Sequence, residues 1–215
     1  MLQKTLLPLV SLVVLIPVAH AVPGAPPGAG GPGGGGGAYA AAPPQPADPT
    51  KAGKTYKLGY EEWQMAAGLQ EAGVGMTGDE AKRNKEAVTA GFERARDKFR
   101  VATESDPNMK EAWNMLGYTS RMLGDYDGSL KAYEKALALQ PDYPEAIEYR
   151  AELFLLTGRL AEAKDAYAWL LKSSKPEYAA TLKTSMQDWV KSQKKAAPGP
   201  ADAGRAEFTA WVKTL

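Results

Sequence analysis

Apolar residues in the central part of the chain recur at the three- and four-residue spacing of an amphipathic helix. One helix is predicted over about 109–123, and its buried face consists of Trp113, Leu116, Gly117, Ser120 and Leu123. A second helix is predicted over about 126–139, and it buries Leu130, Tyr133, Ala136 and Leu137. The central region is therefore expected to be a pair of packed helices.

Short polar signals mark the ends of these helices. Asn108 and Glu111 have the spacing of a capping box, in which side chains satisfy backbone N–H groups at a helix start. Asp142 and Glu145 have the same spacing further along the chain. The dipeptide at 124–125 is a glycine stop followed by an aspartate that can cap the next helix.

The helix pair is repeated with a period of 34 residues. A shift of 34 aligns Gly124 with Gly158, Tyr133 with Tyr167 and, less conservatively, Leu116 with Arg150. In the second copy the inward positions are Ile147, Ala151, Phe154, Leu160, Ala163, Tyr167 and Leu170. Such a repeat predicts a stack in which each helix pair covers the apolar face of its neighbour.

The first copy resembles a tetratricopeptide repeat nearly position for position. The resemblance is carried by residues 111–118, 123–126, 132–137 and 140–141. It implies an all-α fold, a short right-handed α-solenoid of helix pairs, with repeats at 110–143 and 144–177. Arg150 departs from the family pattern, in which a leucine is usual at that position.

The flanks extend the predicted helical domain to residues 79–195. Residues 79–109 are predicted to be a degenerate repeat, and one long solvated helix near 79–105 is the alternative. Residues 178–195 are predicted to be a capping helix, with Leu182, Met186, Trp189 and Val190 on one side. Residues 51–78 form a poorly defined N-terminal segment.

The C-terminal residues 205–215 have the pattern of a short amphipathic helix after a hinge at 196–204. Its apolar stripe consists of Phe208, Trp211, Val212 and Leu215. Three placements are open: packing on the capping helix, docking in the chain's own groove, or docking on a partner.

The first 21 residues have the three parts of a secretory signal peptide. Lys4 precedes an apolar run from Thr5 to Val18, and small residues at 19 and 21 precede the expected cleavage after Ala21. The run of about fourteen residues is shorter than the roughly 20 that span a bilayer. We therefore expect an exported protein, periplasmic or secreted, with no membrane span after cleavage.

The composition of the mature chain excludes several classes of function. Removal of residues 1–21 leaves 25 basic and 25 acidic residues, so no excess of positive charge attracts nucleic acid. The chain has no cysteine, and its single histidine, His20, lies in the predicted signal peptide. We therefore predict a non-enzymatic protein with no catalytic residue, no metal site and no cofactor.

The resemblance also implies a binding groove. In the family, the first helix of each repeat lines a concave surface that holds a peptide or helix of a partner. The corresponding residues here are Glu111, Asn114, Tyr118, Arg121, Glu145, Glu148, Glu152 and Leu155. Glu145, Glu148 and Glu152 would form an acidic stripe, which predicts a basic or amphipathic partner segment.

The function predicted from these features is that of an exported adaptor or scaffold for protein–protein interaction, in cell-envelope assembly or secretion. The alternatives are a structural spacer, in which the carboxylates are only a solvated surface, and a carboxylate-based hydrolase that uses Glu148 with Glu152.

Residues 22–50 are predicted to be a disordered linker, because they contain nine glycines, eight prolines and one charge, Asp48. They should give sharp, fast-relaxing NMR signals, while the rest of the mature chain is strongly helical. Protection from hydrogen exchange within 30–37 in the isolated protein would contradict this prediction.

Overall fold

The computed structural model describes residues 48–193 and 202–215, so the predicted signal peptide, most of the predicted linker and most of the predicted hinge lie outside the described residues. The described residues form eight helices and no strand, which confirms the all-α fold class. The helices are α1 (Pro49–Ala72), α2 (Gly78–Ser105), α3 (Lys110–Met122), α4 (Tyr126–Leu139), α5 (Pro144–Leu156), α6 (Leu160–Lys172), α7 (Glu177–Gln193) and α8 (Asp202–Val212).

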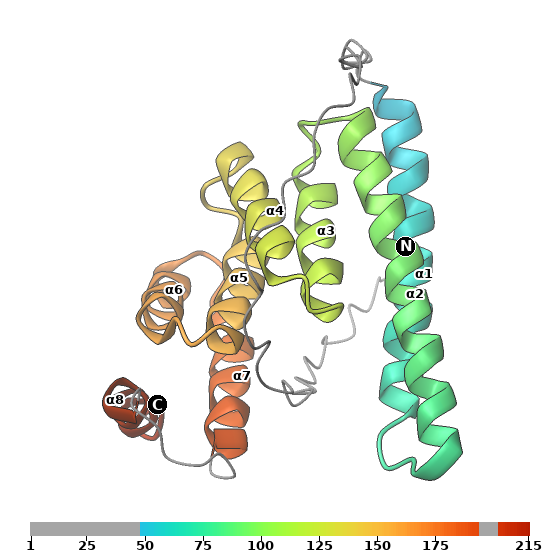
Figure 1. Cartoon of the computed structure of the whole chain (residues 1–215). Coiled ribbons are helices and arrows are strands. Elements are labelled where there is room, and N and C mark those ends of the chain that lie inside the picture. Colours follow the sequence, from blue (N-terminus) through green and yellow to red (C-terminus); the bar gives the residue numbers. More distant parts are fainter. Residues whose placement is uncertain (1–47, 194–201) are drawn as a thin grey trace, which may run out of the picture.

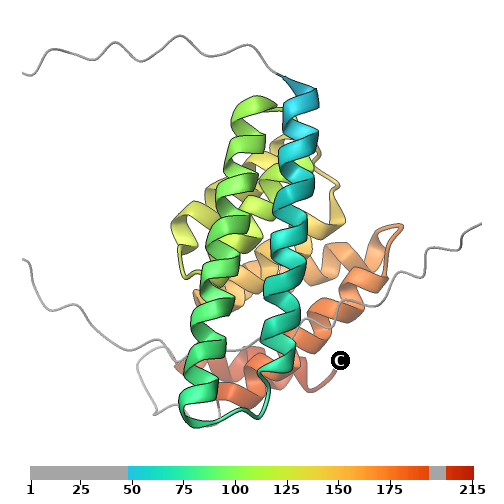
Figure 2. The same cartoon turned by 90° about the vertical axis from the view of Figure 1, so that its right-hand side faces the viewer.

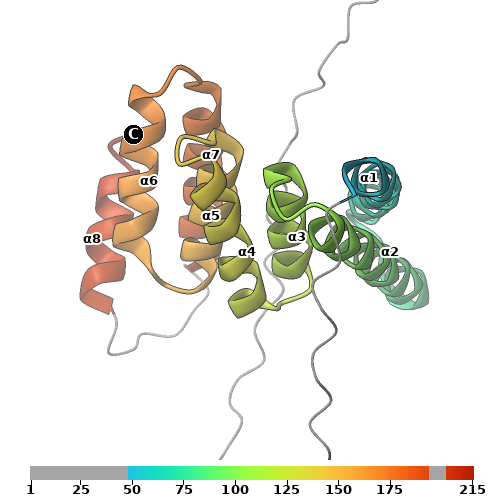
Figure 3. The same cartoon turned by 90° about the horizontal axis from the view of Figure 1, so that it is seen from above.

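The helices follow one another as stacked pairs (Figure 1). Seen from above, α1 and α2 lie at one end of the stack, α3 and α4 follow, and α6, α7 and α8 lie at the other end (Figure 3). This arrangement is the short helical solenoid that the resemblance implied. Among the described residues, none of the helices has both the length and the apolar composition needed to cross a membrane.

The two central helices have the predicted bounds to within one residue at each end. Their connecting turn needs a backbone conformation that favours glycine, because Gly124 has a φ of 81°. Gly158 has a φ of 76° at the same place in the next pair. The Asp125 carboxylate then accepts a hydrogen bond from the Gly128 N–H at 2.9 Å, which confirms it as the N-cap of α4.

The two predicted capping boxes are wrong. The residue at the N-cap of α3 is Met109 and that of α5 is Tyr143, and neither makes a side-chain capping bond. Helix α5 instead opens with Pro144, whose missing N–H removes one donor that a cap would have to satisfy.

The prediction for residues 51–109 also needs correction. The segment 51–78, described from the sequence as poorly defined, forms most of α1, and the degenerate repeat at 79–109 is instead the single helix α2. The alternative of one long helix near 79–105 is the correct one. Helices α1 and α2 run side by side as a long hairpin (Figure 2).

Small residues explain why the sequence pattern concealed α1. Its buried face consists of Ala52, Gly59, Trp63 and Ala66, and three of these four side chains are small. A Cβ atom added at Gly91 of α2 would lie only 2.8 Å from the Ala66 Cβ. The hairpin therefore packs through close backbone approach, which leaves little apolar periodicity in the sequence.

The core of the stack differs from the predicted one at Trp113. This side chain is only half-buried, and its indole N–H donates a hydrogen bond to the Pro107 carbonyl at 2.8 Å. The fully enclosed ring of the first pair is Tyr133, which packs against the backbone of α3 at Gly117. Tyr133 of α4, and not Trp113 of α3, is therefore the enclosed ring of this pair.

The C-terminal helix packs against the chain's own capping helix. Phe208 and Val212 of α8 are buried, and the Phe208 ring lies 5.5 Å from the Trp189 ring of α7 in an edge-on arrangement. Trp211 makes a similar contact with Tyr167 of α6. Of the three placements open from the sequence, the structure has packing on the capping helix.

Gly117→Ala is expected to destabilise the protein, because the new Cβ would lie 2.7 Å from the buried Tyr133 ring. Overpacking costs about 1–3 kcal/mol, and the gain in helix propensity of up to about 1 kcal/mol offsets only part of it. Gly68→Ala is the control, since no atom lies within 4 Å of its added Cβ and the variant should be slightly more stable. Urea denaturation measures both, and a Gly117→Ala protein as stable as the control would contradict this packing.

Candidate functional site

A buried ion pair joins the first helices of two neighbouring pairs. The Arg121 guanidinium of α3 lies 2.6 Å from the Glu152 carboxylate of α5, and both side chains are about 95% or more enclosed. The Ser185 hydroxyl of α7 donates a hydrogen bond to the other oxygen of Glu152 at 2.6 Å. One carboxylate therefore holds three helices together.

Glu148 lies one helical turn before Glu152 and is 1% exposed. Burial raises the pKa of Glu148 well above its usual range, the Glu152 carboxylate raises it further, and Arg121 opposes both only in part. Burial acts to lower the pKa of Arg121, but the Glu152 carboxylate together with Tyr133 and Tyr118 outweighs it, so the pKa of Arg121 is raised. The interior thus favours a neutral Glu148 beside the contact between Arg121 and Glu152.

The structure corrects the exposure expected for the predicted groove residues. Five of the eight are buried: Asn114, Arg121, Glu148, Glu152 and Leu155. Glu111, Tyr118 and Glu145 are half-buried. The expected acidic stripe is wrong, because α7 packs against α5 and only Glu145 of the three glutamates reaches the surface.

Tyrosines surround the two glutamates that remain accessible. We call Tyr56, Glu111, Tyr143, Glu145 and Tyr178 the tyrosine–glutamate surface; all five are half-buried. They come from α1, α3, the turn before α5, α5 itself and α7. The Tyr178 hydroxyl donates a hydrogen bond to the Glu145 carboxylate at 2.5 Å.

Burial and the nearby glutamates both raise the pKa values of the tyrosines on this surface. Burial raises the pKa of Tyr56 to about 12, and Tyr60, Glu111 and Glu145 add to the effect. Burial also raises the pKa of Tyr143, and the same two glutamates contribute. The phenols are therefore neutral at physiological pH, and the surface combines aromatic faces with negative charge.

A lysine of the chain itself, Lys110, contacts this surface. Lys110 Nζ lies 2.5 Å from the Glu111 carboxylate and 5.5 Å from the centre of the Tyr143 ring. Carboxylates and ring faces both attract cations. The arrangement is therefore suited to basic side chains.

Sequence reasoning found Glu111 and Glu145 but missed the tyrosines. Tyr143 and Tyr178 lie at or next to helix starts, outside the positions that the repeat assigns to the groove. Tyr56 belongs to α1. The start of α1 carries a capping signal, but these residues were assigned to the predicted linker over 22–50. The Asp48 carboxylate accepts a hydrogen bond from the Lys51 N–H, and Pro49 opens the helix.

The described residues contain no group of three or more histidine, cysteine, aspartate or glutamate side chains placed to hold a metal ion.

Comparison with known proteins identifies the repeat. The family model of the tetratricopeptide repeat matches residues 110–143, which are α3, α4 and the turn that follows. The chain therefore contains a tetratricopeptide repeat, as the sequence analysis inferred. Repeats that stack in this way create extended binding surfaces for other proteins.

Two relatives share a stretch of 74 residues with the chain. The uncharacterized protein ycf37 of Guillardia theta is 32% identical over this stretch, which covers 34% of the chain and 42% of the relative. Protein O-mannosyl-transferase TMTC1 of Homo sapiens is 33% identical over 34% of the chain, but the stretch covers 8% of that protein. The similarity therefore spans less than half of either relative.

The raised pKa of Glu148 predicts a specific pH dependence of stability. A protonated Glu148 stabilises the fold at low pH, and this contribution is lost as pH rises through its raised folded-state pKa. Glu148→Gln mimics the protonated acid. Its free energy of unfolding relative to that of the unsubstituted protein should therefore increase as pH rises from 5 to about 8. Denaturant titrations at several pH values measure the difference.

The matched control is Glu61→Gln, which removes an exposed carboxylate of α1. Its stability should differ from that of the unsubstituted protein by a constant amount over the same pH range. A Glu148→Gln difference that is equally flat would show that Glu148 is ionised in the folded protein.

Proposed function

We propose that this protein is a non-enzymatic adaptor or scaffold that binds a segment of a partner protein. The tetratricopeptide repeat at 110–143 and the stacking of the helix pairs support the interaction class. The observation that carries the proposal is the tyrosine–glutamate surface, which gathers side chains from α1, α3, α5 and α7 on one side of the stack.

The partner segment is basic or amphipathic. Glu111 and Glu145 offer carboxylates to lysine or arginine side chains, and the rings of Tyr56 and Tyr143 offer faces to the same cations or to apolar neighbours. Exposed ion pairs contribute only about 0–1 kcal/mol each. The partly buried tyrosines therefore supply much of the affinity.

We propose further that the protein works outside the cytoplasm, in the periplasm or as a secreted protein, in envelope assembly or secretion. The support is the three-part pattern of residues 1–21, which lies outside the described residues. The N-terminus of the protein recovered from its source organism tests this step: it begins at Val22 if cleavage occurs after Ala21.

The hydrolase alternative requires two accessible carboxylates, and both of the predicted ones are enclosed. Glu148 and Glu152 are 1% and 2% exposed, and Glu152 is engaged by Arg121 and Ser185. The structural-spacer alternative predicts that no partner binds the tyrosine–glutamate surface.

The test is the double variant Glu111→Gln/Glu145→Gln. Once a partner has been captured by crosslinking from an envelope fraction, the variant should bind it roughly five- to thirty-fold more weakly, because two exposed pairs of about 0.5–1 kcal/mol each are lost. The salt dependence of binding should also become flatter. Fluorescence anisotropy at several salt concentrations measures both.

The control is Asp165→Asn/Glu207→Gln, which removes two exposed carboxylates from α6 and α8. It should leave affinity and salt slope unchanged. Equal binding by the two double variants would mean that Glu111 and Glu145 only keep the surface soluble, as the spacer alternative requires.

A further inference from the structure

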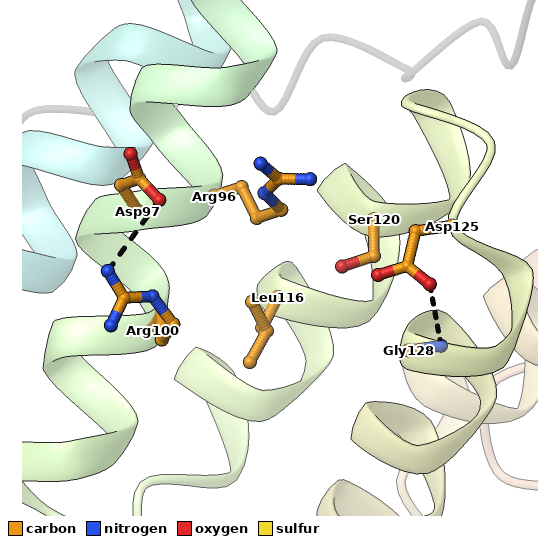
Figure 4. Close-up of a pocket in the computed structure, with 7 residues that line it drawn as sticks. All are labelled: Arg96, Asp97, Arg100, Leu116, Ser120, Asp125 and Gly128. Carbon is orange, nitrogen blue, oxygen red and sulfur yellow. Dashed lines mark hydrogen bonds and ion pairs between the residues drawn. The ribbon is translucent and has the colours of Figure 1, made fainter. Parts of the chain in front are cut away.

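The hollow drawn in Figure 4 has its carboxylates engaged within the chain. It measures about 340 Å³ and lies between α2, α3 and the start of α4. The Asp97 carboxylate lies 3.8 Å from the Arg100 guanidinium. The Asp125 carboxylate accepts a hydrogen bond from the Gly128 N–H. Both acidic groups of this hollow thus have partners in the chain, unlike most of the charged side chains of α1.

Apolar side chains are exposed along the outer face of α1. Five of the eight large apolar side chains that are exposed in the described residues lie in α1 or in the turn after it: Leu58, Tyr60, Met65, Leu69 and Val74. Leu58, Met65 and Leu69 follow one another at intervals of seven and four residues, so they form one stripe along the helix. An apolar stripe that remains exposed in this way is typical of an interaction surface.

The stripe lies at an end of the helical stack. Among the described residues, α1 packs mainly against α2, and its other side is the outside of the stack (Figures 2 and 3). At the other end, α8 covers the apolar face of α7. Terminal elements of a repeat stack need a polar outer face to stay in solution. The α1 end is therefore the one that lacks a covering element.

The charges of α1 run against its helix dipole. Three lysines lie in its first nine residues and three glutamates follow: Lys51, Lys54, Lys57, Glu61, Glu62 and Glu71. A helix start favours negative charge and a helix end favours positive charge, so Lys51 and Glu71 each lie at the unfavourable end. Glu62 pairs with Arg94 of α2 at 2.8 Å, while the other five charges form no ion pair within the described part of the chain.

We propose that the outer face of α1 pairs with the same face of a second copy of this chain, with the two α1 helices antiparallel. A two-fold axis across α1 places the lysines of each helix beside the glutamates of the other, and the apolar stripes meet between them. A parallel pair would instead bring lysines to lysines and glutamates to glutamates. The order of charges that does not stabilise one α1 helix thus suits two.

This pairing leaves the tyrosine–glutamate surface accessible. Tyr56 comes two residues before Leu58 and therefore lies on the opposite side of α1. A dimer would present two such surfaces, which raises the affinity for a partner that carries two matching segments. The pairing itself does not depend on the function proposed for that surface.

The dimer is expected to be weak. A helix of 24 residues is about 36 Å long and about 10 Å wide, so one face of α1 covers about 360 Å². Stable interfaces bury about 800 Å² on each partner. We therefore expect a dissociation constant of about 10–100 µM, as in transient complexes.

Sedimentation velocity of the mature chain, from about tenfold below to about tenfold above this range, tests the proposal. The protein should shift from monomer to dimer and no further. Met65→Glu should weaken the association at least about tenfold, because it places a carboxylate within each apolar stripe. Leu171→Glu is the matched control: Leu171 of α6 is 54% exposed and Met65 is 56% exposed, and the control should dimerise normally.

Charge reversal tests the complementarity. Lys54→Glu/Lys57→Glu and Glu61→Lys/Glu71→Lys should each be monomeric, because like charges then face each other. An equimolar mixture of the two variants should dimerise again, because one α1 is then acidic and the other basic. These side chains are all exposed, so the variants are expected to fold.

Crosslinking tests the orientation, since the chain has no cysteine of its own. Lys51→Cys and Ala72→Cys place one thiol near each end of α1. In an antiparallel pair, a short thiol-reactive crosslinker should join the two variants to each other and neither variant to itself. Glu111→Gln/Glu145→Gln should self-associate like the unsubstituted protein, which keeps this test separate from that of the proposed function.

A mature chain that stays monomeric throughout overturns the proposal and leaves the stripe to a different protein. Leu171→Glu weakening the association as much as Met65→Glu would overturn it as well, because the contact would then involve α6. So would a mixture of charge variants that associates no better than each alone, or crosslinking of either cysteine variant to itself, which requires a parallel pair.

Discussion

The ion pair between Arg121 and Glu152 is the contact on which the arrangement of α3, α5 and α7 depends. Removing two charges from water is costly, and the cost is recovered only when the charges meet with good geometry and further hydrogen bonds. Arg121 comes from α3, Glu152 from α5, and the hydroxyl that completes the carboxylate's bonding is that of Ser185 in α7. A shift of α3 or α5 would leave a buried charge without its partner, and a shift of α7 would remove the Ser185 hydrogen bond from the Glu152 carboxylate.

This constraint places the tyrosine–glutamate surface. With α3, α5 and α7 held together, Glu111, Glu145 and Tyr178 come to lie on one side, and Tyr56 of the long hairpin joins them.

Elements with a strong local pattern could be predicted closely. Helices α3 and α4 combine an apolar face with a glycine turn at Gly124 and the cap at Asp125, and all of these signals lie within a few residues of each other. Helix α1 has no such pattern, because Ala52, Gly59 and Ala66 pack through small side chains. Because α1 was not predicted, Tyr56 was left out of the candidate site. Glu111 and Glu145 could still be found from the 34-residue period.

The sequence by itself determined the helical class, the 34-residue period and the identity of the repeat, because helix formation and turns depend on neighbours a few residues apart. Only the tertiary structure decided which glutamates are buried and which are accessible. Glu145 and Glu152 lie on one helix, yet one faces Tyr178 at the surface and the other is enclosed with Arg121 and Ser185. These partners lie about 30 residues away along the chain, and exposure depends on how the helices that carry them dock.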